Sequence, residues 1–420
     1  MKKLFVNIKK LVQTGTGTQE RALAGREMSR LEVIENGYLL TEGDKISCFG
    51  KMEELENRFS GAGIEEVEII DVKGRMILPA FCDSHTHLVY AGSREQEFID
   101  KVRGLSYQEI ARRGGGILNS ARLLHETSEE ELFRQALARA KEIMGFGTGA
   151  VEIKSGYGLN TEDEIKMLRV ARRISEETPL TVKTTFLGAH AVPERYAGNR
   201  EGYVDEIVNE MIPAIASERL ADYIDVFTEE GFFSVEDTEK IFETGIRYGL
   251  IPKVHANQMS CSGGVQVGVK YGAVSVDHLE STTEEEFRVL KESGTIATLL
   301  PGSTFFLDMR YAPARQMMDY GLPVAIATNY NPGSSPSGDM KFMASLAVLK
   351  MKMTPEEVIN ATTVNGAYAM GLGTTHGSIV AGKKANFIVT REIPSLEYIP
   401  YAFSSLLVEQ LYLNGEKVDL

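Results

Sequence analysis

Short apolar segments, each followed by polar or glycine-rich residues, alternate with helical segments through the middle of the chain. Residues 161–178 and 234–249 are two of these helical segments, with apolar residues at helical spacing. Strands that alternate with helices form βαβ units and a parallel sheet. Eight apolar segments, each short enough to be a strand buried on both faces, predict a closed (β/α)8 barrel. They are ILPAF, GAVEIKSGYG, LTVKTTFLGAH, YIDVFTE, IPKVHANQ, AVSVDHLE, TIATLLPG and PVAIATNYNPG.

The two ends of the chain have the alternating pattern of strands instead. Glu42, Gly43 and Asp44 interrupt one alternating stretch as a hairpin turn would. Either end alone is too short to bury its own core, so we expect the ends to pair into one small composite β-sandwich domain. The sequence therefore predicts an α/β protein with three segments. These are residues 1–75 as the N-terminal part of the β domain, 76–365 as the barrel, and 366–420 as the C-terminal part.

Charge and cysteine content limit the partners and the compartment. The net charge of −14 disfavours nucleic acid and anionic membrane surfaces as partners. No apolar run reaches the roughly 18 residues of a membrane-spanning helix, and the N-terminus does not read as a signal peptide. Three widely spaced cysteines, Cys48, Cys82 and Cys261, do not form a disulfide framework. We expect a cytoplasmic protein with a small-molecule substrate, and we expect the cysteines to be inert.

Most histidines follow predicted strands, where an α/β barrel carries its active site. His85 and His87 are two residues apart on one strand and therefore point to the same side. Two such imidazoles can bind one metal ion, although a surface or core pair would have the same spacing. The other polar residues at predicted strand ends are His190, His255, His278 and Asn329.

Several motifs together resemble one superfamily. ILPAFCDSHTHL is similar to the metal-binding opening of the amidohydrolase superfamily, with Ala80 in place of the usual glycine, and GSIVAGKKANFIV resembles its closing strand hairpin. Further matching motifs run in order over essentially the whole chain, so the chain is identified as a member. They are AGSREQEF, EIKSGYGL, FLGAHAVP, VHANQMSCSGG, SVDHLE and NPGSSPSGDM.

The resemblance implies a metal-dependent hydrolase that is a homodimer. The implied reaction opens the cyclic amide of 4-imidazolone-5-propanoate to N-formimidoyl-L-glutamate. One zinc ion, or alternatively iron, would be bound per subunit by His85, His87, His255 and residue 329. His278 would lie near the metal and steady or protonate the intermediate. A core histidine held by Asp277 is the structural alternative for His278.

The resemblance also implies a set of substrate-binding residues. The substrate carboxylate requires a cation, and Arg94 could supply a two-pronged pairing. Each of these residues has a structural alternative. Arg94 could be a solvated surface arginine, and Tyr157 could belong to a plain glycine turn. His190 could pack in the core, and Gln258 could lie on a loop surface. The implied substrate-binding residues are Arg94, Tyr157, His190, Gln258, Asn331, Gly333 and Ser334. Lys154 also ends a strand, and a structural or substrate-side role is favoured over a metal-bridging one.

Asn329 departs from the family pattern, which has aspartate at this position. The aspartate would be both metal ligand and proton acceptor, whereas an amide has no proton-accepting state near neutral pH. Loss of a general base typically costs 10²–10⁴-fold in rate. The chain could then be a slow or inactive form, could use His278 as the base, or could only bind its ligand. A ring deaminase of the same superfamily is a further alternative, but it would not need Arg94.

Overall fold

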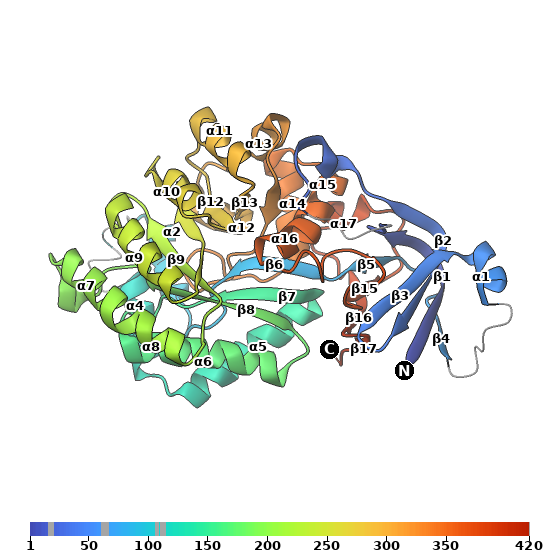
Figure 1. Ribbon diagram of the computed structural model, residues 1–420, viewed down its shortest axis with the longest axis horizontal. Helices are drawn as coiled ribbons and strands as arrows, with labels where there is room; N and C mark the ends of the chain where they lie inside the picture. Colours follow the sequence, from blue (N-terminus) through green and yellow to red (C-terminus); the bar gives the residue numbers. More distant parts are fainter. Residues whose placement is uncertain (16–20, 60–66, 106–108, 110–114, 420) are drawn as a thin grey trace.

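In the computed structural model, the described residues are 1–15, 21–59, 67–105, 109 and 115–419. They form a barrel and a smaller β domain beside it, and both chain termini lie in the smaller domain (Figure 1). The fold class predicted from the sequence is confirmed. The spacing of apolar residues after residue 105 also predicts helix, and residues 106–108 and 110–114 of that stretch lie outside the described residues.

Eight parallel strands form the barrel in chain order. The short strand β10 (Ile251–Pro252) pairs beside β9. The barrel closes between its first and last strands, where the Asn329 amide donates to the His85 carbonyl at 2.9 Å and the His87 amide to the Tyr330 carbonyl at 2.9 Å. The strands are β6 (Phe81–Thr86), β7 (Thr148–Lys154), β8 (Thr181–Ala189), β9 (Tyr223–Thr228), β11 (Val254–Ala256), β12 (Ser275–His278), β13 (Ile296–Leu299) and β14 (Val324–Ile326).

Helices follow the barrel strands, and several begin at side chains that cap their first turn. Ser128 accepts from the Glu131 amide at the start of α5, and Asn160 accepts from the Asp163 amide at the start of α6. The helices that surround or extend the barrel are α2 (Glu95–Val102), α4 (Ile117–Glu126), α5 (Glu129–Gly145), α6 (Thr161–Glu177), α7 (Arg200–Glu206), α8 (Ile212–Ser217), α9 (Val235–Arg247), α10 (Gly264–Lys270), α11 (Glu284–Ser293), α12 (Pro301–Leu307), α13 (Ala314–Tyr320), α14 (Met340–Met351), α15 (Pro355–Thr362) and α16 (Val364–Ala369).

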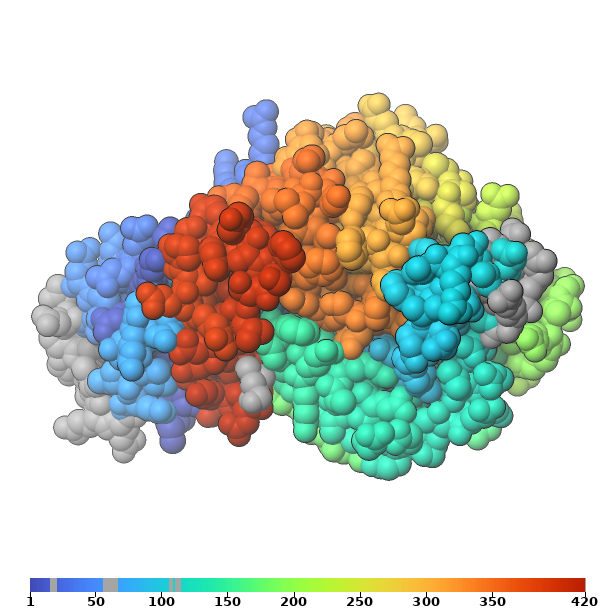
Figure 2. Space-filling view, turned by 180° about the vertical axis from the view of Figure 1, so that it is seen from behind, coloured from blue at the N-terminus to red at the C-terminus, as the bar shows by residue number. Residues whose placement is uncertain are grey.

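The small domain combines strands from both chain ends in one sheet. β15 pairs antiparallel with β5, which joins the C-terminal strands to the N-terminal ones. Figure 2 shows the N-terminal and C-terminal residues packed together on one side of the molecule. The aromatic rings of Phe5, Phe387 and Tyr412 lie 4.9–5.0 Å apart in its core. The strands are β1 (Lys2–Val12), β2 (Val33–Glu42), β3 (Lys45–Lys51), β4 (Val67–Asp71), β5 (Ile77–Pro79), β15 (Phe387–Thr390), β16 (Val408–Leu413) and β17 (Glu416–Lys417).

β5 lies within the range that the sequence analysis assigned to the barrel, because the chain crosses from the small sheet into the barrel at Ala80. Helices α1 (Met52–Phe59) and α17 (Tyr398–Tyr401) lie outside the barrel ring. Among the described residues, every helix is too short or too polar to cross a membrane.

Candidate metal and substrate site

A cavity of ≈ 520 Å³ opens at the C-terminal ends of the barrel strands. His85 does not line it but lies beneath, with its ring centroid 4.5 Å from that of His255 and 5.3 Å from that of His87. Tertiary structure thus brings every residue of the predicted site together. The predicted residues that line the cavity are His87, Arg94, Tyr157, His190, His255, Gln258, His278, Asn329, Asn331, Gly333 and Ser334.

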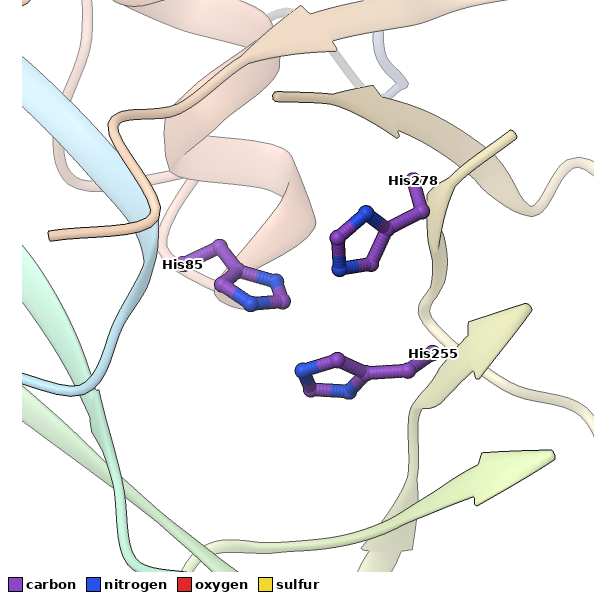
Figure 3. Close-up of side chains that lie close together, drawn as sticks. All are labelled: His85, His255 and His278. Carbon is purple, nitrogen blue, oxygen red and sulfur yellow. The ribbon is translucent and has the colours of Figure 1, made fainter. Parts of the chain in front are cut away.

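Four buried imidazoles cluster at the floor of this cavity. His85, His255 and His278 each offer one ring nitrogen, and these nitrogens lie within 4.8 Å of one another (Figure 3). Nε2 of His87 is 3.4 Å from Nε2 of His255. The resemblance assigned His87 rather than His278 to the metal, and the structure places both rings against His255.

Two buried aspartates orient two of these rings. Nδ1 of His85 donates to Asp277 at 2.7 Å, and Nδ1 of His255 donates to Asp225 at 3.0 Å. Because Nδ1 carries the proton in each ring, Nε2 is left as the free nitrogen. This carboxylate–histidine arrangement is the usual one around metal-binding imidazoles. Asp277 therefore holds His85, not His278 as the structural alternative had it.

The imidazoles of His85, His87 and His190 are neutral near pH 7. Burial, together with the positive charge of Lys154, lowers the pKa of His85 well below its usual value, and burial and His190 do the same for His87. Burial lowers the pKa of His190 to about 3. Neutral imidazoles keep an unprotonated nitrogen available, which is the form that binds a metal ion.

The donor atoms present fit a single bound cation. The buried atoms that have no hydrogen-bond partner within the described part of the chain include His85 Nε2, His87 Nδ1 and Asn329 Oδ1. Buried polar atoms are rarely left unpaired, so a ligand that satisfies them is expected. Nitrogen and neutral oxygen donors of this kind suit zinc or iron.

Two residues of the site adopt left-handed backbone conformations. The φ angle is +52° at Asn329 and +89° at His278. Residues other than glycine seldom adopt this region, although asparagine and histidine are among the types enriched in it. Such conformations cluster at functional sites, where the surrounding structure enforces them.

Arg94 is held beside the cavity by a glutamate. Its Nε and Nη2 donate to one oxygen of Glu97 at 2.9 and 2.6 Å, and Glu97 also accepts from Asn119 at 3.2 Å. Only 10% of the Arg94 side chain is exposed, so it is not a solvated surface arginine. Because Glu97 occupies the Nε side of the guanidinium, the Nη1 side is left for a substrate, next to Gly333.

The Gly-Tyr-Gly loop is anchored from below. Glu164 on α6 accepts from the backbone amides of Gly156, Gly158 and Leu159 at 3.1, 2.8 and 2.9 Å. Nδ1 of His190 donates to the Gly156 carbonyl at 3.0 Å, which leaves its Nε2 unprotonated. The Tyr157 ring lies 5.4 Å from that of His190. The loop is therefore a fixed wall of the cavity, not a plain turn.

The last barrel loop is ordered by Asn331. Its side-chain oxygen accepts from the amides of Gly333 and Ser334 at 2.8 Å each, and its nitrogen donates to the Asn329 carbonyl at 2.6 Å. The Asn331 side chain thus shapes the loop from within. Direct substrate contacts by Asn331, Gly333 and Ser334 stay predictions.

Sequence reasoning missed several buried charged groups under the site. Asp225 was not singled out, although a carboxylate inside the apolar segment YIDVFTE was a usable signal, and Glu152 lies in a similar position in GAVEIKSGYG. Attraction to His255 and Lys154 lowers the pKa of Asp225, although burial alone would raise it. Glu280, which lies 3.4 Å from Nδ1 of His278, was also missed.

Fold and site together define an α/β barrel with a candidate metal site, and residues 234–418 match the Amidohydrolase family. Solved structures with this fold include E. coli guanine deaminase (TM-score 0.75, 14% identity, 100% of this chain and 99% of that one). A triazine hydrolase variant also has it (TM-score 0.75, 16% identity, 99% and 94% covered). At these identities the likeness shows the fold alone.

Sequence relatives define the family more narrowly. An imidazolonepropionase of Flavobacterium johnsoniae is 54% identical over 98% of this chain and 99% of its own length. One of Christiangramia forsetii is 51% identical over 99% of both chains. The chain belongs to the imidazolonepropionase family.

Proposed function

We propose that this protein hydrolyses the cyclic amide of 4-imidazolone-5-propanoate to N-formimidoyl-L-glutamate, a step of histidine degradation. The relatives named imidazolonepropionase support this reaction. One observation carries the proposal. Imidazoles of the buried cluster line the same cavity as the Arg94 guanidinium, whose Nη1 makes no hydrogen bond to the described residues. The first suits an amide carbonyl and the second suits the carboxylate of the propanoate.

Metal binding is assigned to His85, His87, His255 and the amide oxygen of Asn329. A bound metal ion lowers the pKa of a water molecule from 15.7 to about 7 and polarises a carbonyl. We propose one zinc ion per subunit, with iron as the alternative, because both accept nitrogen and oxygen donors. Metal analysis of the purified protein distinguishes the two.

Substrate orientation is assigned to the walls of the cavity. Arg94 would pair with the carboxylate through its Nη1 side, because Glu97 occupies the other side. The unprotonated Nε2 of His190 would accept a hydrogen bond from a ring N–H of the substrate. Tyr157 and Gln258 also line the cavity and would confine the ring.

Proton transfer is assigned to His278. The Asn329 amide cannot accept a proton near neutral pH. Nδ1 of His278 faces Glu280, which also accepts from Thr304 at 3.1 Å, so Nε2 of His278 is turned away from Glu280. A histidine oriented by a carboxylate is a common general base. His278 would take the proton of the attacking water and return it to the leaving nitrogen.

Turnover of imidazolone propanoate by the metal-loaded protein tests this proposal, with His278→Asn and Asn329→Asp measured beside it. We expect turnover by the natural chain and a 10²–10⁴-fold lower kcat in His278→Asn, the usual size of general-base loss. Metal content should be equal in all three proteins. We expect Asn329→Asp to change kcat less than about tenfold, since His278 is already the base.

Other outcomes would contradict parts of the proposal. An increase in kcat of about two decades or more in Asn329→Asp would mean that residue 329 is the position of the base. The natural chain would then be an impaired, ligand-binding form. No turnover by any of the three, with metal present, would contradict the reaction itself. Release of ammonia from purine or pyrimidine bases would then support a ring deaminase.

We also propose a cytoplasmic location and a homodimer. Within the described part of the chain, Cys48, Cys82 and Cys261 form no disulfide, in keeping with a reducing compartment. Light scattering of the purified protein tests the dimer, and fractionation of the source cells tests the location.

A further inference from the structure

Lys154 is completely buried at the end of β7, beneath the imidazole cluster. Its ammonium group lies 2.6 Å from Glu152, 2.8 Å from Asp225 and 3.5 Å from Asp277. A buried ammonium group is retained only where carboxylates compensate its charge. Lys154 does not line the cavity, so it has no direct part in the substrate site described above.

The two aspartates next to Lys154 are those that orient imidazoles. Asp225 on β9 accepts from Nδ1 of His255, and Asp277 on β12 accepts from Nδ1 of His85. Oδ2 of Asp225 lies against both Lys154 and His255. Oδ2 of Asp277 lies against both Lys154 and His85. One ammonium group therefore links both carboxylate–histidine pairs.

Lys253 provides a natural comparison within the same network. It is also completely buried, and it pairs with Glu152. Its other contacts are the carbonyls of Ser84 and Ala369, at 3.2 and 3.1 Å. Among the described residues, no ion pair joins Lys253 to Asp225 or Asp277. The two lysines thus share burial and one carboxylate but differ in their contact with the aspartates.

We propose that Lys154 is a positioning residue that aims Nε2 of His85 and Nε2 of His255 at a common metal ion, an inference that rests on the proposed metal site. Without its charge, Asp225 and Asp277 repel each other in a dry interior. The carboxylates then turn, and the imidazoles that donate to them turn as well. Loss of such outer partners typically weakens metal binding by about 10–100-fold.

The test compares Lys154→Met with Lys253→Met, both prepared free of metal. Zinc affinity is measured by competition with a chelator, and thermal unfolding of the metal-free proteins reports stability. Both variants should lose stability, because each removes a buried cation from Glu152. We expect zinc affinity to fall about 10–100-fold in Lys154→Met only and to stay within about threefold of the natural chain in Lys253→Met.

If Lys154→Met binds zinc as tightly as the natural chain, the inference is overturned and the proposed metal site is not. The same holds if Lys253→Met loses as much zinc affinity as Lys154→Met. If Lys154→Met does not unfold cooperatively, Asp277→Asn gives the test through the aspartate that Lys154 contacts. Zinc affinity should again fall about 10–100-fold, and an unchanged affinity would overturn the inference. A natural chain that binds neither zinc nor iron would overturn the proposed metal site as well. Zinc binding without turnover would contradict only the proposed reaction.

Discussion

Gly333 lies against the guanidinium of Arg94, where a side chain does not fit. A Cβ built on Gly333 would be 2.1 Å from Nη1 of Arg94. The guanidinium is the mobile end of a long side chain, so it can move aside without unfolding the loop. The cost of a larger residue at position 333 should therefore fall on substrate binding rather than on stability.

We expect Gly333→Ala to raise KM for imidazolone propanoate at least about tenfold, the effect of weakening one charge-assisted hydrogen bond. The melting temperature should stay near that of the natural chain. Steady-state kinetics and thermal unfolding check both expectations. Gly145→Ala is the matched control, because a Cβ on Gly145 meets no atom within 4 Å. A lower melting temperature with unchanged KM would mean that Gly333 serves the loop and not Arg94.

At the scale of elements, helix α6 connects the fold to the cavity. Glu164, in its first turn, accepts three backbone hydrogen bonds from the Gly-Tyr-Gly loop that precedes the helix. The loop packs closely against the start of α6, because a Cβ built on Gly158 would be 2.4 Å from the Glu164 amide nitrogen. Position 158 therefore has no room for a side chain. The position of Tyr157 therefore depends on where α6 begins.

We expect Glu164→Ala to loosen this loop, because three buried amides lose their acceptor. Each amide left unsatisfied should destabilise the folded protein by about 1–3 kcal/mol. KM should rise and the melting temperature should fall together. Glu176→Ala, on an exposed position of the same helix, should change neither. Kinetics and thermal unfolding of both variants make the comparison. A Glu164→Ala variant that loses stability but keeps its KM would separate the loop from substrate binding.

For the whole molecule, buried neutral histidines make the metal-free fold sensitive to acid. Burial lowers the pKa of His190 to about 3 and that of His376 to about 4, from the ordinary 6.5. Below about pH 6.5 the unfolded chain binds protons that the folded protein does not bind until about pH 4 or 3. The free energy of unfolding must therefore fall as the pH falls through this range.

We expect each of these histidines to lower the free energy of unfolding by about 2 kcal/mol between about pH 7 and pH 5. Urea unfolding of the metal-free protein at both pH values measures the total. His376 lies outside the cavity, so His376→Gln should remove about 2 kcal/mol of the pH dependence without affecting metal binding. A pH dependence unchanged by this substitution would show that His376 is not neutral in the folded protein.

Much of the fold and site could be predicted from the sequence. The alternation of apolar segments with helices predicted a parallel sheet covered on both faces, and the presence of eight such segments favoured the closed barrel. The ends of those strands then placed His85, His87, His190, His255 and His278 at one face. The two-residue period of a strand aligned His85 with His87. These inferences need only local periodicity and one rule about where parallel strands end.

Tertiary structure alone decided how these residues work together. The free nitrogen of His85 is set by Asp277, 192 residues away, and Lys154 contacts the aspartates of two other strands. Likewise, the pairing of Arg94 with Glu97 determined which side of the guanidinium is open. Such contacts depend on strand register and tilt around the closed barrel, which no local pattern encodes. The sequence by itself determined which side chains reach the site, and the packing of separate strands decided which atom each one presents.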